Sequence, residues 1–355
     1  MTFSNRLISW YLENKRDLPW RNTTNPYKIW LSEIILQQTR VAQGLPYYIA
    51  FVETFPTVFD LANASEEQVL KLWQGLGYYS RARNLHKTAQ LVAFDLGGNF
   101  PTSYQELLKL KGIGTYTAAA IASFSSNEPV PVVDGNVFRV LARYFDVETD
   151  ISSTIAKKEF AALAYEVLDK RNSMQFNQAI MEFGALQCMP KNPNCSVCVL
   201  NDSCVALQKN KINKLPVKLK KTKMTERFFN YLVFEDEHGN SIIQQRTEKG
   251  IWHNLYEFPL IESLIEITEK EITDEINKVK FFSNEIMSIN AYEEKSVLHI
   301  LSHQRLKIRF WNMVPKISLE KQSVTLHISQ LKALTVNLSK SRMLLSQMNS
   351  AMTRT

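Results

Sequence analysis

Apolar residues recur every three or four positions over much of the first two hundred residues, and Gly, Pro and Asn separate the stretches that show this spacing. Side chains at such intervals share one face of an α-helix, as Val137, Val140 and Leu141 would. No alternating strand pattern separates them. The sequence therefore predicts an all-α domain over residues 1–215, with helices in the segments 29–43, 66–72, 117–124, 137–145 and 156–168.

The pattern changes after residue 215. Residues 216–224 open with proline, hold four lysines and have no apolar face, which is typical of an exposed linker. Beyond it, segments 228–234 and 241–245 read as short strands around the turn 237–240, a β-hairpin signal. Residues 297–301 and 306–314 are also strand-like, while 263–280 has helical spacing. We therefore expect an α+β domain over residues 225–355.

Length and composition agree with two globular domains. The chain has 355 residues, of which 45% are hydrophobic and 22% charged, which argues against disorder and coiled coil. The excess of 42 basic over 35 acidic residues falls within residues 1–223, where we expect a surface that binds phosphates. Neither a signal peptide nor a membrane span is evident. We expect a monomeric protein with no membrane association, cytoplasmic and, if bacterial, associated with the nucleoid.

All four cysteines lie within residues 188–204, at Cys188, Cys195, Cys198 and Cys204. Two disulfides would add little to an intracellular chain of this size, so a metal centre is the better interpretation. Structural zinc sites usually present two close cysteine pairs, and only Cys195 and Cys198 have that gap. An iron–sulfur cluster held by four thiolates fits the ligand count equally well.

The sequence LKGIGTYTA, residues 110–118, lies between two helical segments. Gly112 and Gly114 allow a tight turn, and the helix that begins near Thr115 would offer free N–H groups to an anion. An ordinary turn between helices would look similar. The apolar Leu110 and the small residues that follow favour a helix-hairpin-helix over about residues 105–125, which grips a DNA phosphate through backbone amides.

Asp134 stands immediately before a predicted helix, in the sequence VDGNVFRV. Capping the helix is the usual role of an aspartate there. A carboxylate beside a DNA-binding hairpin could also stabilise the positive charge that develops on a sugar when its glycosidic bond breaks. The two roles can coexist.

Glu33 is an acidic residue among large apolar ones, including Trp30, Leu31 and Ile34. A solvated glutamate on a helix face is the default interpretation. Here at least one flank must be buried, and burial raises the pKa of a carboxyl group toward neutrality. Glu33 is therefore a candidate general acid.

These motifs together resemble those of the MutY adenine DNA glycosylases, members of the helix-hairpin-helix superfamily that carry a four-iron four-sulfur cluster. The resemblance extends over nearly all of residues 1–215 and decides the metal question in favour of iron–sulfur. It implies hydrolysis of the glycosidic bond of adenine mispaired with 8-oxoguanine or guanine in double-stranded DNA. It rests on the cysteine spacing together with SEIILQQTRV, LKGIGTYTA, VDGNVFRV, LPWR at 18–21, GLGYYSRAR at 75–83 and FNQ at 176–178.

The resemblance also implies roles for individual residues. Glu33 would protonate the base, Asp134 would stabilise the sugar, and Tyr116 and Asn136 would order the sugar and the attacking water. The four cysteines would hold the cluster. The remaining residues with an implied part in substrate binding are Trp20, Arg21, Gln38, Thr39, Leu76, Tyr78, Gly112, Gly114, Ser302 and His303.

Residues 225–355 resemble the Nudix-like domain of the same family, including GIWHNLYEFP at 250–259. The helical segment that follows has scattered glutamates but no cluster suited to magnesium, which favours 8-oxoguanine recognition over nucleotide hydrolysis. Leu301, Ser302 and His303 match the family loop that contacts 8-oxoguanine, with Leu301 in place of the usual Phe. A plain β-turn is the alternative.

Two other functions are compatible with parts of this sequence. An endonuclease III-like glycosylase/lyase for oxidised pyrimidines needs a lysine to form an imine with the sugar. The resemblance places Tyr116 at that position and Phe138 at a second discussed one, and neither side chain carries an amine. A non-catalytic lesion-binding protein would not need both Glu33 and Asp134.

Overall fold

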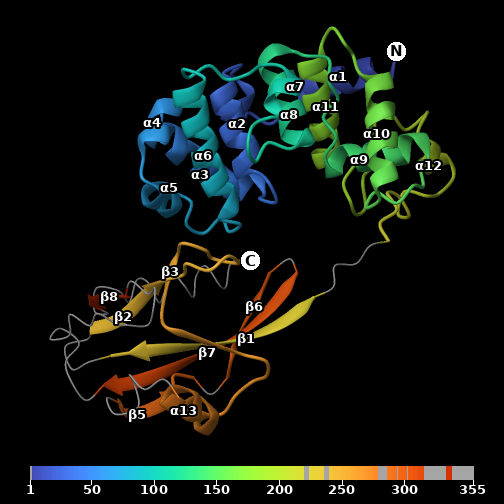
Figure 1. Ribbon diagram of the computed structural model, residues 1–355. Helices are drawn as coiled ribbons and strands as arrows, with labels where there is room; N and C mark the ends of the chain where they lie inside the picture. Colours follow the sequence, from blue (N-terminus) through green and yellow to red (C-terminus); the bar gives the residue numbers. More distant parts are fainter. Residues whose placement is uncertain are drawn as a thin grey trace. The chain divides into compact units, whose positions relative to one another are not determined.

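The computed structural model describes residues 2–219, 224–235, 240–278, 286–293, 295–301, 303–315 and 333–337. The chain divides into two compact units, Met1–Lys220 and Lys221–Thr355 (Figure 1). Several expected features lie outside the described residues: Ser302, residues 220–223 of the linker, residues 237–239 of the hairpin turn and residues 279–280 of a helical segment. No helix in the described ranges is long and apolar enough to cross a membrane.

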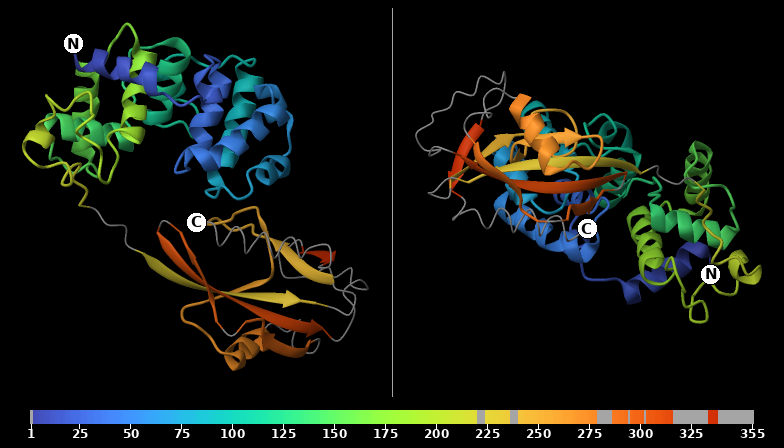
Figure 2. Two further views of the ribbon diagram at one scale, coloured as in Figure 1. Left: turned by 180° about the vertical axis from the view of Figure 1, so that it is seen from behind. Right: turned by 90° about the horizontal axis from the view of Figure 1, so that it is seen from below.

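The first unit is helical, as expected. Its helices lie in two groups, α2 to α6 in one and α1 with α9 to α12 in the other, and α8 contacts both α2 and α11 (Figures 1 and 2). The α-helices are α1 Phe3–Asn14, α2 Pro26–Ile35, α3 Val41–Thr54, α4 Val58–Asn63, α5 Glu66–Leu72, α6 Ser80–Gln90, α7 Tyr104–Leu107, α8 Thr115–Ser126, α9 Gly135–Phe145, α10 Thr154–Val167, α11 Ser173–Leu186 and α12 Val205–Gln208. A 3₁₀ turn covers Pro19–Arg21 and a π-helical turn covers Leu91–Asp95.

The helices begin where their sequences supply caps. The Asn25 side chain accepts hydrogen bonds from the first amides of α2, and Pro26 opens that helix with its backbone angle already suited to it. Ser65 and Gln68 form a capping box at the start of α5. Apolar faces of α1, α9, α10 and α11 meet in one core, in which Phe160, Phe176 and Phe183 are almost fully buried.

One predicted helix was wrong in its extent. Segment 29–43 is not continuous, because α2 ends at Ile35 and α3 begins at Val41. Gln38, between them, has a left-handed backbone with φ of 54°, which a helix cannot continue through. The apolar spacing persists across the break, so periodicity alone predicted one helix where there are two.

The second unit combines two sheets with one helix. One sheet has the order β4-β1-β7-β5 with β6 also paired to β7, and the other has the order β3-β2-β8. Helix α13, Glu269–Lys278, packs its Ile272 and Ile276 with Trp311 and Met313 of β7. The strands are β1 Thr225–Phe234, β2 Asn240–Gln245, β3 Tyr256–Glu257, β4 Leu260–Ser263, β5 Ile286–Ala291, β6 Val297–Ile300, β7 Gln304–Pro315 and β8 Ala333–Asn337.

The predicted β-hairpin was also wrong. In the described part of the chain, β1 pairs in parallel with β7 and antiparallel with β4, while β2 pairs with β3 and β8. Phe229, Tyr231 and Val233 are buried on one face of β1, and Leu232 and Phe234 on the other. Strand β1 is therefore a central strand covered on both faces. The prediction of a hairpin from segments 228–234 and 241–245 did not indicate this position.

Candidate active site and metal centre

Glu33 lies on α2, where every residue from Ile29 to Ile35 is buried, and only 8% of Glu33 is exposed. The pKa of the Glu33 carboxyl is raised to about 7, mainly by burial, and charge repulsion from Asp134 acts in the same direction. A hydrogen bond with Tyr116 and the charge of Arg21 act in the opposite direction without cancelling the effect. The Glu33 carboxyl can therefore hold a proton near neutral pH.

Asp134 caps α9, as its position in the sequence predicts. Its Oδ1 accepts hydrogen bonds of 2.8 Å from the backbone N–H groups of Asn136 and Val137, and its Oδ2 accepts one of 2.7 Å from the Asn136 side chain. Burial raises the pKa of the Asp134 carboxyl, while these hydrogen bonds lower it. The cap fixes the direction of this carboxyl group, so capping and electrostatic stabilisation are compatible here.

Tyr116, in the first turn of α8, forms a hydrogen bond with Glu33 and lies close enough to Asp134 to feel its charge. Burial raises the pKa of the Tyr116 phenol well above its usual value, with the negative charges of Glu33 and Asp134 acting in the same direction. The structure thus brings Glu33 of α2 and Tyr116 of α8 together with Asp134 and Asn136 at the start of α9, three separate segments of the chain.

Arg21 is held by a carboxylate that the sequence did not single out. Glu182 of α11 is 1% exposed, and it accepts hydrogen bonds of 2.8 and 2.6 Å from each of Arg16 and Arg21. Burial would raise its pKa, but these two guanidinium groups lower the pKa of Glu182 to about 2. Arg21 is consequently fixed close enough to Glu33 for its positive charge to lower the pKa of the Glu33 carboxyl. Trp20, beside it, is 9% exposed and packs edge-on against Tyr48 at 5.1 Å.

The expected hairpin consists of α7, a turn and α8. Gly112 has φ of 77°, and a Cβ there would lie 2.9 Å from the Cβ of Asn84, so both its backbone and its surroundings favour glycine. Gly114 is the N-cap of α8 and has open space around it. The N–H groups at the start of α8 are therefore accessible to an anion.

Four of the residues with an implied part in substrate binding occupy two turns. Gln38 and Thr39 lie between α2 and α3, and Tyr78 lies before α6 with φ of 48° and 45% of its surface exposed. Leu76, in the same turn as Tyr78, is only 6% exposed, so its side chain would have to be uncovered to contact a base.

The four cysteines are partly buried and surround one pocket, whose walls include Val140, Phe183 and Leu200. In the described ranges, no three His, Cys, Asp or Glu side chains converge closely enough to hold a single metal ion. Two donors approach the sulfurs: Arg143 Nη1 lies 3.4 Å from Cys188 Sγ, and the Leu200 N–H lies 3.4 Å from Cys198 Sγ. Four thiols with an apolar wall and donors to sulfur fit an iron–sulfur cluster.

Arg139 joins this pocket to the catalytic candidates. Its Nε donates to the Cys188 carbonyl at 2.7 Å, and its Nη2 donates to the Asn136 side chain at 2.8 Å and to the Gly184 carbonyl at 2.6 Å. Asn136, whose side chain donates a hydrogen bond to Asp134, is thus held by an arginine that also contacts the cysteine loop.

Sequence reasoning missed Glu182, Arg139 and Arg143. Each is a charged residue on the apolar face of a helix, and all three are at least 92% buried. A charged residue at a core position in the helical periodicity was the available signal, since such a group is rarely buried without a partner. This signal marks Glu33 and these three residues alike.

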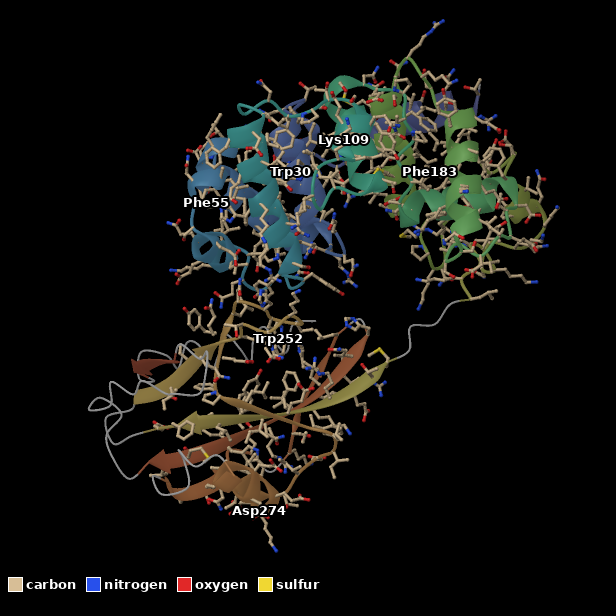
Figure 3. The ribbon with its side chains drawn as sticks, in the orientation of Figure 1. Trp30, Phe55, Lys109, Phe183, Trp252 and Asp274 are labelled. Atoms are coloured by element: carbon tan, nitrogen blue, oxygen red, sulfur yellow. The ribbon has the colours of Figure 1, made fainter. Side chains whose placement is uncertain are left out.

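In the second unit, His303 is exposed, and its carbonyl accepts a hydrogen bond of 3.1 Å from the Thr225 N–H. Glu257, within the segment 250–259, is buried and paired with Arg246 at 2.9 Å, and the Tyr231 hydroxyl donates to it at 3.0 Å. Figure 3 places Trp252 of the same segment in this unit, and Trp30 and Phe183 on α2 and α11 of the helical unit.

Comparison with known proteins gives three family matches. Residues 31–165 match the HhH-GPD superfamily of base excision DNA repair proteins, residues 188–204 the iron–sulfur binding domain of endonuclease III, and residues 230–340 the NUDIX domain. The chain therefore carries an iron–sulfur cluster site at the four cysteines, as the sequence predicted.

Relatives over most of the chain share one name. An adenine DNA glycosylase of Buchnera aphidicola from Baizongia pistaciae is 34% identical over 90% of this chain and 88% of its own length. That of Buchnera aphidicola from Schizaphis graminum is 37% identical over 78% and 79%. Among solved structures, a thermostable thymine-DNA glycosylase is 28% identical with a TM-score of 0.55, covering 58% of this chain and 95% of that one.

Proposed function

The chain belongs to the MutY-type adenine DNA glycosylases, and on that premise we propose that it removes adenine mispaired with 8-oxoguanine or guanine from duplex DNA. The reaction is hydrolysis of the N-glycosidic bond. The observation that carries the proposal is the Glu33 carboxyl, buried and with its pKa at about 7, beside Tyr116 and Asp134.

The first step is extrusion of adenine from the helix. Backbone amides of the hairpin at Gly112 and Gly114 would hold a phosphate of the strand, without reading its sequence. Gln38, Leu76 and Tyr78 would help to fill the space that the base leaves, and Thr39 would take part in substrate binding. Extrusion costs a few kcal/mol and less for a mispair, so the mispair itself favours entry into the pocket.

The second step breaks the bond. Protonated Glu33 would transfer its proton to a ring nitrogen of adenine, so that the base departs as a neutral molecule; general acid catalysis of this kind contributes about 10²- to 10⁴-fold. Ionised Asp134 would stabilise the positive charge on the sugar. Tyr116 and Asn136 would order the sugar and the attacking water, and Trp20 and Arg21 would lie beside the adenine.

The cluster needs no part in the bond breakage. Cys188, Cys195, Cys198 and Cys204 would hold it, and it would close a loop that contains Lys191 and neighbouring amides suited to phosphate. Residues 225–355 would read 8-oxoguanine through Ser302 and His303, with residues 216–224 as the linker. Since every residue of the proposed chemistry comes from one chain, we propose that a monomer performs it.

Purified protein incubated with duplexes that carry adenine opposite 8-oxoguanine, guanine or cytosine tests this function. Strand cleavage that appears only after alkali, and only opposite the first two bases, supports monofunctional adenine removal. Cleavage at oxidised pyrimidines without alkali would instead support an endonuclease III-like lyase. Tight binding with no cleavage of any duplex would identify a lesion-binding protein.

A further inference from the structure

Arg81, the second residue of α6, joins the two turns that carry Gln38 and Tyr78. Its Nη1 donates to the carbonyls of Ile34, Ile35 and Gln37 at 3.0, 3.1 and 2.6 Å. Its Nη2 lies 3.3 Å from the carbonyls of Leu76 and Gly77. One guanidinium group thus contacts five backbone carbonyls from two segments about forty residues apart in the chain.

The position of Arg81 is not explained by its own helix. A cation in the first turn of α6 is unfavourable there, because the N-terminal end of a helix dipole is positive. The carbonyls of Ile34 and Ile35, by contrast, lie at the C-terminal end of α2, where backbone acceptors lack partners within the helix and a cation is stabilised. The contacts with the Ile34 and Ile35 carbonyls at the end of α2 therefore offset the unfavourable position of Arg81 in its own helix.

Two aromatic rings also hold the guanidinium group. Its carbon lies 5.0 Å from the ring centre of Trp73 and 5.6 Å from that of Tyr78. The Trp73 Nε1 donates to the Gly77 carbonyl at 2.9 Å, so the turn is fixed on the same side. Burial lowers the pKa of Arg81 to about 10, which leaves the group charged at neutral pH.

We propose that Arg81 is a positioning residue that locks residues 36–40 and 74–79 into one rigid unit for base extrusion. This proposal rests on the function proposed above. Gln38 and Tyr78, one in each segment, both have left-handed backbones, with φ of 54° and 48°. Such strained residues keep their conformation only when their surroundings fix it, and Arg81 supplies contacts to both turns.

The geometry calls for arginine rather than lysine. A guanidinium group is planar, carries donors on both terminal nitrogens and stacks on aromatic rings, so it can serve two turns at once. A lysine ammonium is one point charge. It could keep the contact with α2 or the contact with the Leu76–Gly77 turn, but it could not keep both contacts and also stack on the aromatic rings. Arg81→Lys should therefore retain the fold and lose the coupling.

Hydrogen–deuterium exchange on the full chain tests the coupling without any substrate. Arg81→Met is compared with Lys87→Met, which removes an exposed cation from the same helix. In Arg81→Met, amides in both 36–40 and 74–79 should exchange faster, while Lys87→Met should resemble the wild type. Faster exchange in only one segment, or in neither, would overturn the proposal.

Excision kinetics test the consequence. Single-turnover removal of adenine is measured opposite 8-oxoguanine and opposite an abasic site, where the base is already free of its partner and extrusion is easier. Arg81→Met and Arg81→Lys should lose about tenfold to a hundredfold opposite 8-oxoguanine and several-fold less opposite the abasic site. Equal losses on both substrates would contradict the positioning role.

Thermal melting and the iron content of each variant identify general unfolding, which would slow excision from every substrate alike. The excision activity of the wild type distinguishes failure of the proposed function from failure of the proposed role of Arg81. If it removes no adenine from any duplex, the proposed function fails, and the exchange experiment alone decides on Arg81. If it is active and Arg81→Met matches it on both duplexes, only the role of Arg81 fails.

Discussion

Two buried glutamates in the helical unit show how surroundings set the chemistry of one residue type. Glu33 has no cation in direct contact in the described part of the chain, and burial raises its pKa to about 7. Glu182 forms ion pairs with two guanidinium groups, and these lower its pKa to about 2 despite burial. Glu33 is therefore suited to donating a proton and Glu182 to holding Arg16 and Arg21 in place.

The pH dependence of adenine excision follows from these carboxyl groups. Glu33 must be protonated, so the rate should fall as pH rises through about 7. Asp134 must be ionised, so the rate should also fall on the acid side, through a pKa above the ordinary aspartate value. The measurement is the single-turnover rate from pH 5 to 9. A rate that stays constant between pH 6 and 9 would exclude Glu33 as the acid.

For single residues, the sequence predicted those whose adjacent residues in the chain indicate their surroundings. Glu33 stood out because large apolar residues adjoin it, and Asp134 because it precedes a helix. Glu182 could not be linked to Arg21, since the two residues are 161 positions apart and only the packing of α11 against α1 and the turn after it brings them together. The roles assigned to individual residues remain predictions.

At the scale of elements, helices with caps and a clear apolar face were predicted well, and their junctions were not. Segment 66–72 is helical over the predicted range, whereas 29–43 contains a turn at Gln38. Arg81 binds the Ile34 and Ile35 carbonyls at the end of α2, a long-range contact that local periodicity does not encode. Strand pairing failed for the same reason, because β1 pairs with β7 across about seventy residues.

The contact between α11 and α9 gives a prediction about packing. A Cβ at Gly184 would lie 2.6 Å from the Cβ of Asn136 and 3.0 Å from the backbone oxygen of Asn136. Because this oxygen belongs to the backbone of α9, it cannot move aside as a flexible side chain would. Gly184→Ala should therefore lower the free energy of unfolding by about 1–3 kcal/mol, more than the ~1 kcal/mol that alanine gains over glycine in a helix. Excision should also fall, because Asn136 is displaced.

Urea unfolding measures the effect, with Gly135→Ala as the control for stability because a Cβ there meets nothing within 4 Å. A Gly184→Ala variant as stable as the wild type would show that the two helices can separate without cost, contrary to this packing.

The cysteine loop gives a prediction about the cluster. Cys198→Ala removes one of the four ligands, so the brown colour and the iron content should be lost, and affinity for DNA should fall with them. Absorbance, iron analysis and a binding titration measure this, with Val197→Ala as the control, since Val197 is 66% exposed in the same loop. Unchanged DNA affinity in protein that lacks iron would refute the docking role.

At the scale of the whole molecule, composition predicted the division into a helical and an α+β unit, because the apolar period and the charge both change near residue 215. The sheet order could not be predicted, since it depends on contacts between strands far apart in the sequence. The helical unit supplies the proposed chemistry. Residues 225–355 have equal numbers of basic and acidic residues and are proposed to recognise the base opposite adenine.

This division predicts which substitutions change specificity. His303→Ala should reduce the preference for adenine opposite 8-oxoguanine over adenine opposite guanine by about tenfold, the value of one lost hydrogen bond, and leave removal from the guanine mispair nearly unchanged. Lys270→Ala, at an exposed position of α13, is the control. Equal losses on both mispairs would place His303 outside recognition.

The most direct test of the account is the replacement of Glu33 by glutamine, which keeps the shape of the side chain and removes its transferable proton. Glu33→Gln should bind the adenine:8-oxoguanine duplex as the wild type does and excise adenine at least about 100-fold more slowly. Glu53→Gln, at an exposed position on α3, should excise at the wild-type rate. Excision by Glu33→Gln at the wild-type rate would contradict the account.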